Sequence, residues 1–246
     1  MEIESFFKKY NRVTVSVSGG VDSAVLLYFA KQYADKVYAC FVKSEFQPEF
    51  ELRDALSVCR FLHIELKVIN ASVLSESKIA SNPKDRCYYC KRKIFSEICS
   101  FAKSNNSSVI EGTNADDDID DRPGFKAINE LGVLSPLRLC GLTKNDVRKI
   151  AISVGIPVGQ KPSYACLATR VPTGTEITKD ILGITEKAES RLFEMGFSDF
   201  RVRYHNGNAM LELTKEDRLK YLSNKDKFDL LLKPYYNKIQ LSDKVR

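Results

Sequence analysis

The sequence lacks tryptophan and has only two histidines, His63 and His205, among its 246 residues. Neither histidine stands at zinc-finger spacing from a cysteine. No apolar run approaches the ~20 residues that a membrane-spanning helix needs. The segment Met1 to Arg12 is charged near both ends and has no apolar core of the signal-peptide kind. We therefore expect a cytoplasmic protein that does not act at a membrane.

Seven cysteines are present, and an odd number argues against a disulfide framework in a reducing compartment. The net charge of +6 comes from 38 basic and 32 acidic side chains that are spread along the chain. One local basic cluster lies between Lys84 and Lys93 and would attract anions of any kind. A diffuse charge of this size makes nucleic acid an unlikely partner, and we expect an anionic small molecule instead.

Strands and helices alternate over the first two thirds of the chain. This alternation predicts an α/β domain over residues 1–172 with a parallel sheet and helices on both faces. Thr143 and Asp146 form a capping-box-like pair that predicts a helix start. The predicted strands are 13–17, 37–42, 65–69 and 108–111, and the predicted helices are 22–34, 50–62 and 91–103.

The pattern changes after Pro172, and we place a domain boundary near residues 172–178. Residues 173–246 predict a small α+β domain with a helix over 179–195 and another over 215–223. Asn206-Gly207 joins two short β-rich runs, which predicts a hairpin with a type I′ turn. Such a small domain is suited to substrate binding or to association between copies of the chain.

The segment Ser18-Gly19-Gly20-Val21-Asp22-Ser23 follows the first predicted strand and opens a helix. Glycines allow a phosphate to approach the backbone closely, and a helix start offers unpaired N–H groups. Ser18 and Ser23 add hydroxyl donors, while Asp22 suits a site that also takes Mg²⁺. The alternative interpretation is a tight turn in which Asp22 only caps the helix.

The full string S-G-G-x-D-S resembles the pyrophosphate loop of the PP-loop ATP pyrophosphatase superfamily, and it lacks the G-K-[ST] ending of the Walker type. The resemblance implies a Rossmann-like fold of the adenine nucleotide alpha hydrolase kind. It also implies that ATP is cut between its α and β phosphates, so that a substrate is adenylated and pyrophosphate leaves.

Cys87 and Cys90 form a C-x-x-C pair, and Cys166 follows 76 residues later. The pair is compatible with a zinc site, an iron site or a redox dithiol, and spacing alone does not choose among them. The other four cysteines are expected to be small core residues: Cys40, Cys59, Cys99 and Cys140.

Within this superfamily, an ordered set of motifs resembles one family in particular, the LarE family of ATP-dependent sulfur transferases. The set covers about residues 10–215. It comprises Ser18–Ser23, Asp85–Lys91, Glu111–Asp117, Arg122–Gly124, Ser135–Leu137, Gly141–Lys144, Ala165–Arg170 and Arg201–Arg203.

The resemblance implies a role in making the nickel-pincer nucleotide cofactor. ATP with Mg²⁺ would activate a carboxylate of pyridinium-3,5-biscarboxylic acid mononucleotide as an acyl-adenylate, and sulfur would displace AMP to leave a thiocarboxylate. A carboxylate needs this activation because its oxygen is otherwise a poor leaving group. Ser18 and Asp22 would act in adenylation, with Gly19, Gly20 and Ser23 holding phosphate.

Cys166 matches the sulfur-handling cysteine of the family. Some members give up the sulfur of this cysteine, whereas the presence of Cys87 and Cys90 resembles a subgroup in which three cysteines hold a [4Fe-4S] cluster. We expect the cluster and keep a sacrificial or persulfide Cys166 as the alternative.

Further residues are candidate ligands of the nucleotide or the substrate. Asn114 and Asp117 lie where ligands bind in open α/β sheets, whereas Asp120 and Asp121 are interpreted as a solvated loop. Arg170 suits bidentate binding of a phosphate or carboxylate. The family match suggests phosphate binding by Arg201 and Arg203, with Glu189 and Glu212 as acidic or metal-binding partners; a plain salt-bridge set is the alternative.

Two other functions stay open from the sequence. A tRNA thiolase also combines a PP-loop with cysteines, and a regulator that binds nucleotide and a structural zinc would need neither turnover nor iron. The family resemblance further implies a homo-oligomer, with other cofactor-synthesis enzymes as possible partners. These alternatives predict different metals and different dependence on RNA.

Overall fold

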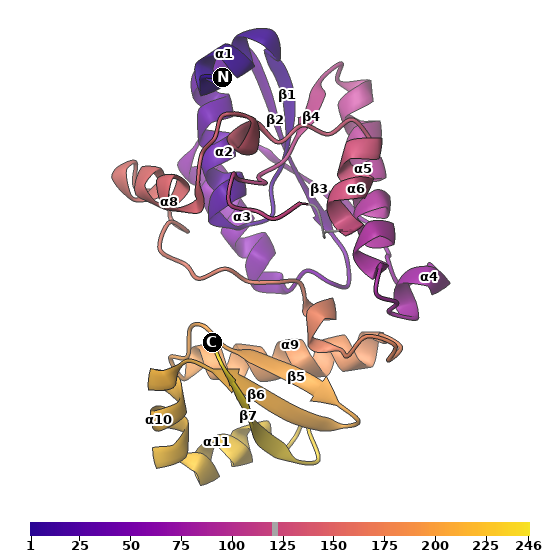
Figure 1. Cartoon of the computed structure of the whole chain (residues 1–246), viewed down its shortest axis with the longest axis vertical. Coiled ribbons are helices and arrows are strands. Elements are labelled where there is room, and N and C mark those ends of the chain that lie inside the picture. The colour runs from indigo at the N-terminus through magenta and orange to yellow at the C-terminus, as the bar shows by residue number, and fades with distance from the viewer. Residues whose placement is uncertain (120–122) are drawn as a thin grey trace. The chain divides into compact units, whose positions relative to one another are not determined.

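The computed structural model describes every residue except 120–122 and divides the chain into two compact units (Figure 1). The first unit comprises residues 1–73 and 85–161, and the second comprises residues 74–84 and 162–246. The boundary expected at 172–178 falls inside the second unit. Residues 162–171 belong there because arginines of its sheet bind their backbone carbonyls. Within the described part of the chain, no helix has the length and apolar character to cross a membrane.

The first unit contains a four-stranded parallel sheet in the order β3-β2-β1-β4. This confirms the predicted α/β fold with a parallel sheet. Its strands are β1 (Arg12–Ser16), β2 (Lys36–Lys43), β3 (Leu66–Asn70) and β4 (Ser108–Ile110). Its helices are α1 (Ile3–Lys9), α2 (Val21–Tyr33), α3 (Glu49–Phe61), α5 (Arg86–Ser104), α6 (Pro123–Glu130), α7 (Pro136–Leu139) and α8 (Lys144–Ser153).

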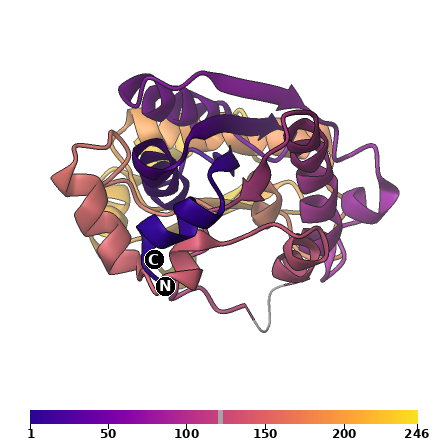
Figure 2. The same cartoon turned by 90° about the horizontal axis from the view of Figure 1, so that it is seen from above.

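Helices cover both faces of this sheet, as the alternation of its strand residues requires. On β2, Ala39 and Phe41 join a core with α1, α2, α3, α7 and α8, whereas Cys40 and Val42 join a second core with α5 and α6. Successive strand residues point to opposite faces, so one strand supplies both cores. Figure 2 shows α5 and α6 side by side, with α8 on the opposite side of the unit.

Parallel strands direct their carboxyl ends to one edge of the sheet. The loops after β1 and β4 therefore meet there, and both carry candidate residues from the sequence. The predicted capping box at Thr143 is confirmed: Asp146 donates its N–H to the Thr143 hydroxyl at 3.2 Å and its carboxylate accepts the Thr143 N–H at 3.1 Å. This cap fixes the start of α8 beside the same loops.

The second unit packs helices on a three-stranded sheet in the order β5-β6-β7, with β5 and β6 antiparallel and β6 and β7 parallel. The predicted hairpin is confirmed, because Asn206 and Gly207 both adopt positive φ, at 47° and 79°. Its elements are α4 (Ser77–Ala80), the 3-10 helix η1 (Leu167–Arg170), α9 (Lys179–Glu194), β5 (Arg201–His205), β6 (Asn208–Leu213), α10 (Lys215–Ser223), α11 (Lys225–Leu232) and β7 (Ile239–Val245).

Two of the cysteines expected to be packing residues are fully buried. Burial raises the pKa of Cys40 to about 12 and that of Cys59 to about 11, which keeps both thiols protonated and unreactive. Cys99 and Cys140 are half-buried, and burial raises the pKa of each above its ordinary value. All four therefore differ from the exposed Cys87.

Candidate active site

The loop between β1 and α2 is held in shape by its own side chains. The Ser18 N–H donates to the Ser23 hydroxyl at 3.1 Å, and that hydroxyl donates to the Gly20 carbonyl at 3.0 Å. The Gly20 N–H in turn donates to the Ser18 hydroxyl at 3.3 Å. Among the described residues no side chain caps the first turn of α2, whose N-cap is Gly20, so the positive end of the helix is suited to an anion.

Two glycines allow the backbone segments of this site to approach closely. Gly19 has φ +83°, and a Cβ placed on it would lie 2.4 Å from the Glu51 carbonyl oxygen of α3. A Cβ on Gly112, after β4, would lie 2.8 Å from the Ser23 nitrogen. Side chains at either position would force the loop to move. The role of Gly19 was predicted from its motif, whereas the packing of Gly112 against α2 was not.

Asp22 is the point where three segments meet. The Asn114 side-chain amide donates to Asp22 Oδ1 at 3.1 Å, and the Lys144 ammonium group contacts Asp22 Oδ2. The side chains of Asp22 and Lys144 are 24% and 29% exposed, so both charges can be reached from solvent. A carboxylate in this setting fits the oxygen ligands that Mg²⁺ prefers, and the ammonium group fits a phosphate.

Asn114 is buried, and its orientation is fixed by its own turn. Its N–H donates to Asp117 Oδ2 at 3.0 Å, and its Oδ1 accepts the Asp116 N–H at 2.9 Å. Asp116 also accepts the Lys144 N–H at 2.8 Å. The structure therefore brings Asn114 to Asp22 as expected for one site, while Asp117 lies in the same loop. Asp120, Asp121 and Arg122 lie outside the described residues.

Lys144 was missed as a site residue, although the motif Gly141–Lys144 contains it. It is the first residue of α8, where the helix dipole disfavours a cation. A lysine at this position therefore needs a compensating anion, which Asp22 supplies. A lysine at the start of a helix could therefore have indicated a site residue from the sequence alone. Its partner Asp22 could not be predicted in this way, because it is 122 residues away in the sequence.

Cys87 and Cys90 lie in the first two turns of α5, which begins at Arg86 rather than at Lys91 as predicted. Residues three apart on a helix share one side of it, so the two thiols are neighbours. Arg86 Nη2 donates to Cys87 Sγ at 3.7 Å. Cys87 also borders a cavity of about 230 Å³, whose lining further includes Lys91, Thr113, Asp117, Phe125 and Ile128.

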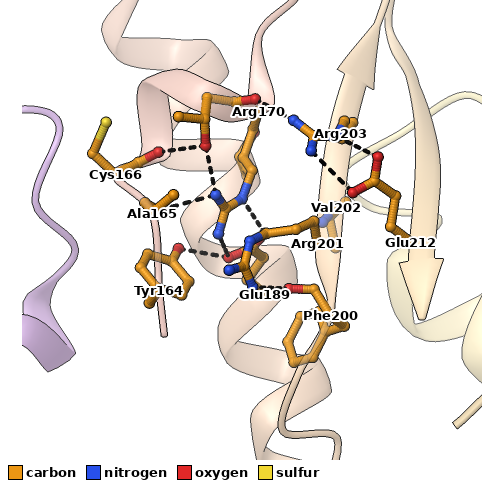
Figure 3. A network of polar contacts seen from close by, with 12 residues as sticks. Tyr164, Ala165, Cys166, Arg170, Glu189, Phe200, Arg201, Val202, Arg203 and Glu212 are labelled. Carbon is orange, nitrogen blue, oxygen red and sulfur yellow. Dashed lines mark hydrogen bonds and ion pairs between the residues drawn. The ribbon is translucent and has the colours of Figure 1, made fainter. Parts of the chain in front are cut away.

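In the second unit, Arg170 and Glu189 form a buried ion pair (Figure 3). Arg170 donates to both Glu189 oxygens, at 2.7 and 3.1 Å, and the same carboxylate accepts the Tyr164 hydroxyl at 2.6 Å and the Val202 N–H at 2.9 Å. Burial opposes the charge of Arg170, but the Glu189 carboxylate outweighs it and raises the pKa of Arg170.

Arg201 and Arg203 both reach the segment that carries Cys166. Arg201 Nη2 donates to the Ser163 carbonyl at 2.8 Å, and Arg203 Nη1 donates to the Thr169 carbonyl at 2.5 Å. Arg203 also binds both oxygens of Glu212, at 2.6 and 2.9 Å. Burial opposes the charge of Glu212, but the positive charges of Arg203, Lys244 and Arg246 together outweigh it and lower the pKa of Glu212.

These contacts change how the arginines can act. Four of the five N–H groups of the fully buried Arg170 have partners inside the unit, so most of its hydrogen-bonding capacity is already used there. The role expected for Arg170, bidentate binding of a substrate anion, stays a prediction. Burial, with Arg170 and Arg246 nearby, lowers the pKa of Arg201 to about 10, which marks a surplus of positive charge. Glu189 and Glu212 are each paired with an arginine, and a metal-binding role for either stays a prediction.

Within the described residues, no three histidine, cysteine, aspartate or glutamate side chains lie close enough together to hold a metal ion. Cys87 and Cys90 belong to the first unit and Cys166 to the second. Thiolates are nonetheless the donors that iron–sulfur clusters take. The positive charges of Arg86 and Lys91 on the same helix end would offset the negative charge of such a group. The three-cysteine ligand set stays a prediction.

Comparisons with known proteins agree with this site. The family model described as queuosine biosynthesis protein QueC matches residues 12–88, which contain the loop and Asp22. Pyridinium-3,5-bisthiocarboxylic acid mononucleotide synthase of Lactiplantibacillus plantarum is 34% identical over 209 residues, which cover 84% of this chain and 76% of that protein. Uncharacterized protein slr1717 of Synechocystis sp. is 33% identical over 217 residues, covering 87% and 81%.

A more distant relative is tRNA-specific 2-thiouridylase MnmA of Thermotoga petrophila, 25% identical over 194 residues that cover 61% of this chain and 54% of that protein. The parallel sheet and its phosphate loop thus define a PP-loop enzyme that uses ATP. The chain belongs to the LarE family of ATP-dependent sulfur transferases, which confirms the family expected from the motifs.

Gly19→Ala tests the close approach in the phosphate loop. We expect pyrophosphate release to fall about 100-fold, because the new Cβ pushes the loop away from Glu51 and small displacements at a reacting centre are costly. The matched control is Gly174→Ala, which has the same φ of +83° but nothing within 4 Å of its Cβ. Equal activity of the two variants would contradict the role assigned to the close approach.

Lys144→Met tests the ammonium group beside Asp22. Loss of one preorganised charge that faces a departing phosphate costs about 10²–10³-fold in rate, so substrate-dependent pyrophosphate release is expected to fall by that factor. Lys149→Met, at an exposed position of the same helix, is the control and should keep full activity. Pyrophosphate release at the parent rate by Lys144→Met would show that Lys144 has no role in this step.

Proposed function

We propose that this enzyme adenylates a carboxylate of pyridinium-3,5-biscarboxylic acid mononucleotide and converts it to a thiocarboxylate, in the synthesis of the nickel-pincer nucleotide cofactor. The observation that carries the proposal is the similarity over 84% of the chain to a protein named for the bisthiocarboxylic acid product. The Ser18–Ser23 loop with Asp22 and Lys144 supplies the matching chemistry for ATP.

The first step follows from the residues of the first unit. A substrate carboxylate oxygen attacks the α-phosphorus of ATP, the bond to the bridging oxygen breaks, and pyrophosphate leaves. Ser18, Ser23 and the start of α2 would face the phosphates, Asp22 would hold Mg²⁺, which stabilises the developing negative charge when bound, and Lys144 would offset the charge of the leaving group. The cavity beside Cys87 has a mostly apolar lining that includes Phe125 and suits a flat ring.

The second step needs sulfur at the activated carbon. Sulfur attacks that carbon, the carbon–oxygen bond to AMP breaks, and AMP carries the oxygen away. We propose that Cys87, Cys90 and Cys166 provide the thiolates for a [4Fe-4S] cluster. When bound by three thiolates, such a cluster supplies one iron that is open to external sulfide, which spares the sulfur of Cys166.

A tRNA thiolase is the second candidate, since the similarity to MnmA covers 61% of the chain. That relative is less similar than the synthase, and it is matched over only 54% of its own length. Copurified tRNA, with binding that weakens steeply as salt rises, would support this alternative. Pyrophosphate release that requires the mononucleotide and not tRNA would exclude it.

We also propose that copies of the chain associate. Leu219 and Leu222 on α10 and Leu230 on α11 are 69%, 55% and 70% exposed, an arrangement that favours burial between copies. Light scattering is expected to give a mass that is a multiple of 27.9 kDa. Leu219→Glu with Leu230→Glu should lower that mass, and a monomeric parent protein would contradict the proposal.

Iron analysis and pyrophosphate release test the two steps separately. After anaerobic reconstitution we expect about four irons per chain and a visible spectrum, both lost in Cys87→Ser and Cys166→Ser. Cys99→Ser, at a half-buried position outside the set, should keep both. Ser18→Ala should abolish adenylation and keep the iron.

A colourless parent protein would contradict the cluster, and mass spectrometry after turnover would then decide the alternative. Loss of one sulfur atom at Cys166 would identify a sacrificial cysteine, and an intact thiol would exclude it. Pyrophosphate release by Ser18→Ala at the normal rate would contradict the assignment of the loop.

A further inference from the structure

Tyr164 lies two residues before Cys166 and connects the charged groups of the second unit. Its hydroxyl donates to Glu189 Oε2 at 2.6 Å. The guanidinium carbons of Arg170 and Arg201 lie 4.4 and 5.2 Å from the centre of its ring. One half-buried side chain therefore meets a carboxylate and two guanidinium groups at once (Figure 3).

The same network holds the backbone on both sides of Cys166. Arg170 Nη1 donates to the Ala165 carbonyl at 3.0 Å and to the Thr169 hydroxyl at 2.7 Å. That hydroxyl donates to the carbonyl of Cys166 itself at 2.8 Å. Arg170 is thus bonded directly to the carbonyl of Ala165 and, through one hydroxyl group, to the carbonyl of Cys166. Figure 3 shows the sulfur of Cys166 pointing away from the network.

Two like charges stand near each other in this network, and Tyr164 offsets part of their repulsion. Burial and the neighbouring Arg170 lower the pKa of Arg201, which reports that repulsion. The face of an aromatic ring attracts cations, and the attraction grows where water is excluded. The Glu189 carboxylate offsets the charge of Arg170. The ring of Tyr164 contacts the guanidinium groups of both Arg170 and Arg201.

We propose that Tyr164 is a positioning residue for sulfur transfer: through Arg170 and Glu189 it fixes the backbone around Cys166 and so sets the direction of the thiol. The inference rests on the proposed role of Cys166. In this proposal Arg170 holds the backbone near Cys166 and does not contact the substrate. Its full burial and the internal partners of its N–H groups agree with that role.

Tyr164→Leu and Tyr164→Phe separate the ring from the hydroxyl. In Tyr164→Leu we expect thiocarboxylate formation to fall about 100-fold, since a displacement near 1 Å has that effect, while pyrophosphate release and the KM for ATP stay unchanged. Tyr164→Phe keeps the ring, and Glu189 keeps three of its four donors, so most activity should return. Tyr235→Leu, whose parent hydroxyl pairs with Arg191, is the matched control.

Alkylation gives a readout that does not depend on turnover. The rate at which iodoacetamide modifies Cys166 in iron-free full-length protein, mapped by mass spectrometry, should change several-fold in Tyr164→Leu and little in Tyr164→Phe. Cys140 in the same sample should react at its parent rate, which shows that the change is local.

Sulfur transfer at the parent rate in Tyr164→Leu would overturn the proposal, as would equal losses of pyrophosphate release and transfer. If Tyr164→Leu does not fold, Arg170→Lys decides, since lysine keeps the charge but not the paired geometry, and parent-rate transfer in it would overturn the proposal too. Persistent transfer in Cys166→Ser would instead refute the proposed role of Cys166. The two failures are therefore distinguishable.

Discussion

The close approach of backbone segments at one edge of the parallel sheet is the constraint on which the first unit depends. Four strands end in the same direction, so the chain must leave β1 and β4 within the same small space. Gly19 fits against the Glu51 carbonyl and Gly112 against the start of α2 only because neither has a side chain. That packing places the start of α2, Asp22 and Asn114 together, which is the arrangement that the proposed phosphate site needs.

Charge pairs in the two units are built for different purposes. Asp22 and Lys144 are each about a quarter exposed, as the roles proposed for them toward Mg²⁺ and phosphate require. Arg170 and Glu189 are buried, and removal of either would leave an unpaired charge in the interior. The first pair is therefore suited to chemistry and the second to holding the Cys166 segment in place.

The features that could be predicted from the sequence depend mostly on residues that are close together in the chain. The strand–turn–helix around Ser18–Ser23 and the Asn206-Gly207 hairpin depend on neighbouring residues, and both were predicted correctly. Lys144 and Tyr164 were missed because their partners Asp22 and Glu189 are 122 and 25 residues away. For Arg170 the side-chain type suggested an anion site, but only the fold shows that four of its five N–H groups have partners inside the protein.

The cysteines of the chain lie in different environments. Cys40 and Cys59 are buried in apolar cores that keep their thiols protonated, and burial acts in the same direction on Cys99 and Cys140. Cys87 instead contacts the Arg86 guanidinium at the start of a long helix, and Cys166 lies in the segment bound by Arg170. The same residue type therefore packs in apolar surroundings at four positions, whereas Cys87 and Cys166, for which sulfur or iron chemistry is proposed, lie near cationic groups. Cys90, the third proposed ligand, is buried beside Cys87 on the same helix.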